Sequence, residues 1–359
     1  MTIKIVIGWE LIMTAIEEDI FNLIDDSPSL DYYKNKTVLI TGANGMIPAY
    51  FVYLFLEMNN SMNSNVKVIA LVRNKEKAQK KFANYIGNKH LIFLVQDVCD
   101  PIILGYNIDI IIHAASQASP KYYGIDPVGT INSNVLGTNN LLNLAKEKNV
   151  SNFLFLSSSE VYGIPDKKAE ITEDGYGYID ILNIRSCYAE SKRLAETMCV
   201  SWHHQFDIPI KIARIHHTYG PGMLLDDGRV FADFVENIVN NTDIIIKSDG
   251  LAKRPFCYIT DCISAMLRIM MYGEYGQAYN IANIKNYLSV KELANLLVSL
   301  YPEKKLQVKF ENMNNIVKYL PNKIIEVCPN VDKITSLGWS PTVDVSVGFN
   351  RTINSFMER

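Results

Sequence analysis

The chain has 359 residues, of which 48% are hydrophobic and 20% are charged, and its formal net charge at pH 7 is -3. This length and composition are typical of a soluble globular protein that is large enough for two domains and a sizeable core. The nearly balanced charge predicts neither nucleic acid nor an anionic membrane as a partner. The six cysteines form no CxxC pair, which argues against a disulfide framework and favours a reducing cytoplasm.

An N-terminal extension, residues 1–34, precedes the first clear strand. Its first residues, MTIKIVIGWELIM, are too few and too interrupted by Glu10 for a signal peptide or a membrane span. Thr14 and Glu17 have the spacing of a capping box, and the segment that follows is amphipathic. We therefore expect a helix over residues 14–25, and no function is assigned to the extension.

From residue 37 onward, short β-branched runs alternate with helical patterns. The expected strands are residues 37–41, 66–72, 91–95, 108–115, 153–159 and 210–215. Because these runs are almost continuously apolar, we expect helices on both faces of the sheet they form, including residues 47–59 and 135–149. The order predicts an α/β fold, a Rossmann-type doubly wound parallel sheet, with the dinucleotide-binding domain at residues 35–220.

The alternation of short strands and helices ends near residue 220. Longer helical patterns with irregular connections follow at residues 231–241 and 290–300. We expect a smaller C-terminal α/β lobe, residues 221–359, that binds the substrate. One or two of its segments are expected to return to the sheet.

A glycine-bearing turn follows the first strand, in the stretch Thr41-Gly42-Ala-Asn-Gly45. Such a turn between a strand and a helix lets the backbone approach a pyrophosphate, whose charge is favoured at the helix N-terminus. The third position of the motif is Pro48 instead of glycine, which the first turn of a helix accepts. The stretch predicts a dinucleotide cofactor.

Two residues after the second and third strands bear on the choice of cofactor. Arg73 stands where an acidic residue would bind a ribose diol, and a cation there suits a 2′-phosphate. NADP is therefore favoured and NAD remains possible; the alternative is that Arg73 stacks on the adenine or faces solvent. Asp97 is a candidate acceptor for the adenine amine or only a turn residue.

Tyr188 and Lys192 are four residues apart in a helical pattern, so they share one face. An ammonium roughly 5 Å away stabilises a phenolate by about 3 kcal/mol, which lowers the tyrosine pKa by about two and makes it a usable base. Ser158 ends the fifth strand, where ligands bind in open α/β sheets, and its hydroxyl can share a substrate oxygen with Tyr188. The alternative is that Ser158 only caps a loop.

The chain resembles the extended short-chain dehydrogenases that modify nucleotide sugars, the epimerases and dehydratases, from residue 37 to about residue 339. The matching stretches are TGANGMI, IIHAASQASP, NSNVLGTNNLL, LSSSEVYG, CYAESKRLAETM, RIHHTYGPGMLLDDGRVF and KRPFCYITD. The resemblance implies that Tyr188 is the catalytic base, Lys192 its partner and a nicotinamide-ribose ligand, and Ser158 the group that polarises the C4 oxygen of the sugar. It also implies a homodimer formed through the helix that carries Tyr188 and the one near residues 134–148.

Further site residues follow from the same resemblance. The residues expected at the cofactor are Gly42, Asn44, Gly45, Met46, Ile47, Arg73, Asp97, Val98, Ala114, Ala115, Ser116 and Lys192. The residues expected at the nucleotide sugar are Ser119, His217, Arg229 and Arg254, the two arginines near the diphosphate or else in ion pairs.

The fate of the C4 ketone depends on the residues beside Ser158. Ser159 stands where a dehydratase carries an aspartate acid, and Glu160 is either a second acid/base or a residue that only orders the loop. The motifs look most like UDP-glucuronate decarboxylase, although the arginine that meets the substrate carboxylate is Val327 and an expected asparagine is His217.

Four reactions therefore remain open: C4 epimerisation or 4-ketosugar reduction as the main expectation, decarboxylation, and 4,6-dehydration. A cofactor-binding regulator without catalysis is a further alternative. No metal site is expected, because His203 and His204 diverge on a helix and His216 and His217 follow a strand.

Overall fold

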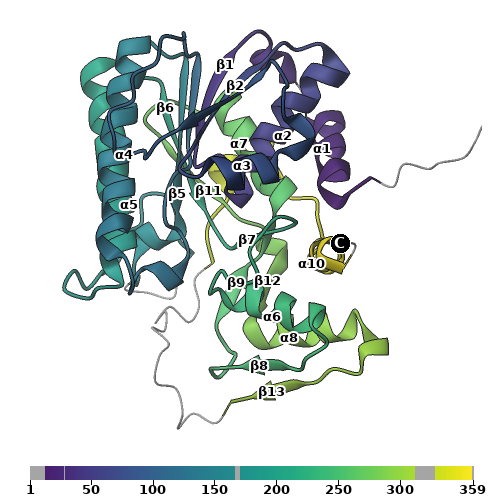
Figure 1. The fold of residues 1–359 in the computed structure, drawn as a ribbon. Coiled ribbons are helices and arrows are strands. Elements are labelled where there is room, and N and C mark those ends of the chain that lie inside the picture. Colours follow the sequence, from purple (N-terminus) through teal and green to yellow (C-terminus); the bar gives the residue numbers. More distant parts are fainter. Residues whose placement is uncertain (1–12, 28, 166–169, 312–327, 358–359) are drawn as a thin grey trace, which may run out of the picture.

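The computed structural model describes residues 13–27, 29–165, 170–311 and 328–357. Within these ranges the main sheet has seven parallel strands in the order β11-β6-β5-β4-β1-β2-β3 (Figure 1). The strands are β1 (Thr37–Thr41), β2 (Lys67–Val72), β3 (Leu91–Val95), β4 (Ile110–His113), β5 (Asn152–Ser158), β6 (Ile210–Ile215) and β11 (Ala278–Ile281). The doubly wound α/β fold expected from the sequence is confirmed.

Helices cover both faces of this sheet. α4 (Pro127–Lys148) and α5 (Ser186–Phe206) pack against each other on one face, and α2 (Met46–Met62) and α7 (Ile259–Tyr272) cover the other (Figure 1). The short α3 (Lys75–Lys81) connects β2 to β3.

The alternation of side chains along β1 supplies two cores. Val38 and Ile40 pack in the core that contains α2 and α7, and Leu39 packs in the core that contains α4 and α5. All three side chains are fully buried. Burial of each contributes roughly 1.5–3 kcal/mol, which explains why the strand is almost continuously apolar.

Two element ends differ from the expected ranges for identifiable reasons. β4 ends at His113 because the backbone N–H groups of Ala114 and Ala115 donate to the Thr41 hydroxyl instead of to a strand. α4 begins earlier than residue 135 because Asp126 caps it by accepting from the Gly129 N–H, with Pro127 as its first residue.

The remaining elements form a smaller group at one end of the main sheet (Figure 1). They include α6 (Val230–Val239), β8 (Ile244–Ile246), β9 (Lys253–Pro255), α8 (Val290–Ser299), β12 (Tyr287–Ser289) and β13 (Val308–Phe310). β8 pairs with β13, and β9 pairs with β12. From the same part of the sequence, β11 joins the main sheet beside β6, and β10 (Cys257–Tyr258) pairs with β7 (Thr218–Tyr219). The boundary between residues 220 and 221 stays a prediction.

The N-terminal extension contains helix α1 (Ala15–Asp26), as expected from its capping box. The Thr14 side chain accepts from the Glu17 N–H at 3.3 Å, and the Glu17 carboxylate accepts from the Thr14 N–H at 2.8 Å. The helix packs on α2, α7 and the C-terminal helix α10 (Val345–Met357), which follows the short α9 (Asp332–Thr335).

A buried carboxylate joins α1 to these three elements. Asp19 accepts hydrogen bonds from the hydroxyls of Tyr50 at 2.9 Å and Tyr258 at 2.8 Å, and from the Arg351 guanidinium at 2.8 Å. Burial raises the pKa of Asp19, and Arg351 partly offsets this effect. Helix α1 is thus part of the folded unit and links the C-terminal helix α10 to α2 through Asp19.

We predict that Arg351→Met lowers the free energy of unfolding by about 2 kcal/mol, because it leaves the Asp19 carboxylate buried without its cation. Chemical denaturation monitored by circular dichroism measures the loss. The control is Lys309→Met, which removes the largely exposed partner of Asp243 and should leave the stability nearly unchanged. Equal effects of the two substitutions would contradict the structural role of Asp19.

Candidate active site

A cavity of about 1150 Å³ lies at the carboxyl ends of β1, β4 and β5 and extends to residues of the smaller group of elements. Its volume exceeds the range typical of a site for one small ligand, about 300–1,000 Å³, so it has room for a cofactor and a substrate. All the site residues expected from the sequence line it: Gly42, Asn44, Gly45, Met46, Ile47, Arg73, Asp97, Val98, Ala114, Ala115, Ser116, Ser119, Ser158, Ser159, Glu160, Tyr188, Lys192, His217, Arg229 and Arg254. Their individual roles stay predictions.

The glycine turn forms one end of the cavity. Gly42 has φ +61°, a conformation that favours glycine, and a Cβ there would lie 2.9 Å from the Ala115 Cα. Gly45 is the N-cap of α2, and no side chain caps the free N–H groups of that helix. Pro48 lies buried in the first turn, as the sequence analysis expected. The turn therefore leaves backbone donors and space for a pyrophosphate.

The neighbouring wall also fits a dinucleotide. The Ser116 hydroxyl is buried and has no hydrogen-bond partner among the described residues. After β2 and β3, an Arg73 Nη lies 3.9 Å from an Asp97 carboxylate oxygen. The Arg73 side chain is 65% exposed. The other Asp97 oxygen accepts from the Cys99 N–H at 2.9 Å, so this carboxylate also orders the turn after β3.

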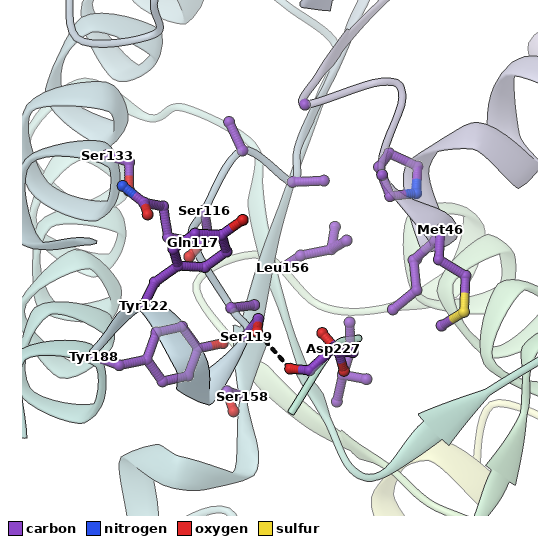
Figure 2. Close-up of a pocket in the computed structure, with 18 of the residues that line it drawn as sticks. Met46, Ser116, Gln117, Ser119, Tyr122, Ser133, Leu156, Ser158, Tyr188 and Asp227 are labelled. Carbon is purple, nitrogen blue, oxygen red and sulfur yellow. Dashed lines mark hydrogen bonds between the residues drawn. The ribbon is translucent and has the colours of Figure 1, made fainter. Parts of the chain in front are cut away.

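Tyr188, Ser158 and Lys192 come together in the middle of the cavity. The Ser158 hydroxyl acts as a hydrogen-bond partner that lowers the pKa of Tyr188, and Figure 2 shows the two side chains close together in the pocket. Lys192 is buried, and its Nζ donates to the Leu156 carbonyl of β5 at 2.7 Å. The Lys192 Nζ lies 6.0 Å from the centre of the Tyr188 ring. The one-face arrangement expected from their spacing is confirmed.

The electrostatic expectation for Tyr188 was wrong. Burial raises the pKa of Tyr188 to about 12, the hydrogen bond with Ser158 opposes this rise, and the Glu160 carboxylate adds to it. Burial also lowers the pKa of Lys192 to about 7. The loss of hydration is therefore the largest cause of both pKa shifts, and at neutral pH the Tyr188 phenol keeps its proton.

Glu160 follows Ser158 in the short 3-10 helix η4 (Ser159–Tyr162). Ser158 caps this helix by accepting from the Glu160 N–H at 3.2 Å. The two Glu160 oxygens accept from the two terminal nitrogens of Arg185, each at 3.0 Å. Glu160 is thus ion-paired at the wall of the cavity, and Ser159 brings a hydroxyl in place of a carboxyl acid.

The side of the cavity nearest the smaller group is positively charged. Arg229 donates to an Asp227 carboxylate oxygen at 2.5 Å and to the Ala118 carbonyl at 2.8 Å, and the Ser119 hydroxyl donates to the Asp227 carbonyl. Figure 2 shows Ser119 beside Asp227. Arg229 therefore joins the segment after β4 to the segment before α6 and still lines the cavity.

Arg254 and His217 complete this side. The Arg254 guanidinium donates to the Lys253 carbonyl at 2.7 Å and lines the cavity. Burial lowers the pKa of His217 well below its usual value, and Arg254 adds to this effect, so the imidazole is neutral. Val327, the residue found in place of an arginine, lies outside the described residues.

No group of three His, Cys, Asp or Glu side chains among the described residues is arranged to hold a metal ion. In the part of the chain that the structure describes, no helix is both long and apolar enough to span a membrane.

The comparison with known families decides the classification of this site. The model of the NAD dependent epimerase/dehydratase family matches residues 38–282. The chain belongs to this family. The family resemblance expected from the motifs, that of an extended short-chain dehydrogenase, is confirmed, and the protein is an enzyme of this type.

Individual members of the family agree with this assignment. The chain is 33% identical to UDP-glucuronic acid decarboxylase 6 of Arabidopsis thaliana over 318 residues, which is 88% of each chain. UDP-glucuronic acid 4-epimerase from Bacillus cereus, solved with UDP-glucuronic acid and NAD, has a TM-score of 0.76 at 24% identity and covers 90% of this chain and 99% of its own. UDP-glucose 4-epimerase from Thermotoga maritima, solved with UDP-glucose, has a TM-score of 0.77 at 21% identity, with coverage of 90% and 99%.

Two residues of this epimerase/dehydratase site were missed by sequence reasoning. The Tyr123 ring stacks on the Tyr188 ring with centroids 5.1 Å apart and an interplanar angle of 14°. Arg185 binds Glu160, as described above. Arg185 precedes Tyr188 by three residues, a spacing that places both on one side of a helix and was a usable signal. Tyr123 lies far from Tyr188 in sequence, and no spacing pointed to the stacking.

We predict that Lys192→Met changes how stability depends on pH. The pKa of Lys192 is about 7 in the folded protein and 10.5 ordinarily, so between these values the unfolded chain binds more protons and the lysine makes the wild-type protein more stable as pH rises. The stability of Lys192→Met relative to wild type should therefore be highest at pH 7 or below and fall toward pH 10. Urea denaturation across this range measures it, and a constant difference would contradict the low pKa.

Proposed function

We propose that the protein catalyses oxidation and reduction at C4 of a nucleotide sugar, with a nicotinamide dinucleotide as its cofactor. The observation that carries the proposal is the placement of Tyr188, Ser158 and Lys192 in the same cavity as the glycine turn. The volume of the cavity and the cations Arg229 and Arg254 on its other side support a substrate with a diphosphate.

Tyr188 and Ser158 have different roles at the C4 oxygen of the sugar. A bound nicotinamide dinucleotide supplies the hydride acceptor or donor. Tyr188 moves the proton of the C4 hydroxyl: it returns a proton when a C4 ketone is reduced and takes one when the alcohol is oxidised. Ser158 donates to the same C4 oxygen and polarises it. Because the Tyr188 pKa is about 12, its protonated form dominates at neutral pH, which suits the direction of ketone reduction.

Epimerisation at C4 or reduction of a 4-ketosugar is the main proposal for the overall reaction. Neither reaction needs a second catalytic group beyond the Tyr188 set, and the bidentate pairing with Arg185 already engages both oxygens of the Glu160 carboxylate. Ser159 lacks the carboxyl acid expected for loss of a hydroxyl, so 4,6-dehydration is not favoured.

Decarboxylation of a nucleotide hexuronate is the second candidate. It is supported by the 33% identity to UDP-glucuronic acid decarboxylase 6, over 88% of both chains. A ketone at C4 makes the C5 carboxylate a β-keto acid, so the C5–carboxylate bond breaks with release of carbon dioxide. A proton then adds at C5, and the ketone is reduced again. The substrate carboxylate would need a cation, and Val327 does not provide one at the position where an arginine was expected.

A homodimer in the cytoplasm completes the proposal. Its support is the family resemblance and the apolar side chains that α4 and α5 expose, among them Leu136 at 47%, Leu194 at 48% and Val200 at 45%. The location rests on the six scattered cysteines, as in the sequence analysis.

We propose NADP as the preferred cofactor, because Arg73 is exposed at the end of β2 and offers a cation to a 2′-phosphate. Arg73→Ala should weaken binding of NADP about tenfold and leave binding of NAD nearly unchanged. Calorimetric titration of both dinucleotides measures this. Lys80→Ala, a charge loss on the neighbouring α3, is the control. Equal loss for both dinucleotides, or tighter binding of NAD by the wild type, would reject the preference.

The reaction is tested by incubating the protein with a panel of nucleotide sugars and hexuronates and both dinucleotides. Mass spectrometry of the products separates the candidates: no change in mass with an altered retention time indicates epimerisation, a gain of two hydrogens reduction, loss of carbon dioxide decarboxylation, and loss of water dehydration. Absence of any product across the panel, with dinucleotide bound, would favour a regulator without catalysis.

Tyr188→Phe is expected to lower turnover at least about 100-fold, because it removes the proton donor and keeps the ring that stacks on Tyr123. The thermal midpoint should change little. Tyr178→Phe, at a tyrosine that is 62% exposed, is the matched control and should keep full turnover. Unchanged turnover in Tyr188→Phe would refute the proton-transfer role.

A further inference from the structure

The residue at the start of α5 is not explained by the helix itself. Arg185 is the N-cap of α5 and makes no side-chain cap hydrogen bond. N-cap positions favour residues whose side-chain oxygen accepts from a free backbone N–H, and arginine has no such oxygen. A cation at this end also opposes the helix dipole. The arginine is therefore unfavourable for the helix, and its contacts lie elsewhere.

Those contacts are with Glu160. Both terminal nitrogens of Arg185 donate to the two oxygens of Glu160 at 3.0 Å, in the planar fork that pairs a guanidinium with a carboxylate. The Arg185 side chain is 22% exposed and the Glu160 side chain 21%. Glu160 lines the cavity, whereas Arg185 is not among the described residues that line it. The guanidinium thus contacts the carboxylate without being one of the described side chains that line the cavity.

The same guanidinium also contacts the ring next to Tyr188. Its central carbon lies 5.7 Å from the centre of the Tyr123 ring, and that ring stacks on Tyr188. The Tyr123 hydroxyl donates to the Ala118 carbonyl at 3.1 Å, so the ring is held at both its edge and its face. One side chain therefore supports both groups that flank the phenol of Tyr188.

We propose that Arg185 is a positioning residue that holds Glu160 at the wall of the cavity as a hydrogen-bond acceptor for the sugar, and that holds the Tyr123 ring against Tyr188. The inference rests on the proposed function, since it describes how side chains are held around the C4 carbon at which the proposed reaction takes place. The arginine acts through Glu160 and Tyr123, and it is not among the described residues that line the cavity.

A double-mutant cycle tests this indirect action. The turnover number and KM are measured for Glu160→Gln, Arg185→Gln and the double variant, on the substrate that the panel identifies. Each single substitution should lower the turnover number about tenfold, and the double variant should be no slower than the slower single variant, because removing Glu160 removes the main group through which Arg185 acts. Multiplying losses would show that Arg185 acts independently of Glu160 and would overturn the proposal.

Two further variants separate positioning from folding. Arg185→Lys keeps the charge but not the two-pronged fork, so it should recover only part of the turnover lost in Arg185→Gln. Arg193→Gln is the matched control, because Arg193 lies on the same helix and donates to the carbonyls of Val161 and Gly177 at 2.6 and 2.7 Å. It should lower the thermal midpoint, and its effect on the turnover number should not couple to that of Glu160→Gln.

A crystal structure of Arg185→Gln gives a readout that does not depend on turnover. The Glu160 carboxylate should leave its position and the Tyr123 ring should lose its parallel stacking on Tyr188. If both stay in place, the proposal is wrong even where the C4 reaction is established. If both move while the wild type converts no nucleotide sugar, the positioning role stands and the proposed reaction fails.

Discussion

The hydrogen bond from the buried Lys192 ammonium to the Leu156 carbonyl is the contact on which the arrangement of the active site depends. This bond fixes the position of α5 along its axis relative to the end of β5. Tyr188, one helical turn earlier, then lies beside Ser158, the last residue of the same strand. Because the lysine is surrounded by protein, its ammonium is costly to keep charged, and its pKa falls to about 7. An apolar residue at this position would be better for stability, so its presence argues for function.

The parallel sheet brings the remaining groups to this point. The carboxyl ends of β1, β4 and β5 are adjacent, so the glycine turn, the Ala114–Ser116 segment and Ser158 lie along one edge. The Thr41 hydroxyl accepts from two backbone N–H groups after β4 and fixes the distance between the first two of these segments. Asp19 of α1 binds both Tyr50 of α2 and Arg351 of α10, so it joins these two helices to α1.

Charged side chains of both signs influence the ionisation of the Tyr188 phenol. The Glu160 carboxylate opposes ionisation of Tyr188, and Arg229 favours it. Desolvation exceeds both, so the residues alone leave a protonated tyrosine, which can donate to a ketone oxygen. Arg185 holds the Glu160 carboxylate near this phenol by binding both of its oxygens. The same cavity can therefore support several reactions of a C4 ketone. Which of them takes place depends on neighbouring side chains such as Ser159.

The sequence by itself determined the α/β fold, six of the seven strands of the main sheet, the capping-box helix and a set of residues that line the cavity. Each of these depends on local signals: apolar runs, cap residues, a glycine turn, and the four-residue spacing of Tyr188 and Lys192. Tertiary structure alone decided the pKa of Tyr188, because burial depends on every neighbour and not on one lysine. It also decided the stacking of Tyr123, the partner of Glu160 and the role of α1. These contacts join residues that are far apart in the chain, and no sequence spacing records which distant side chains a fold brings together.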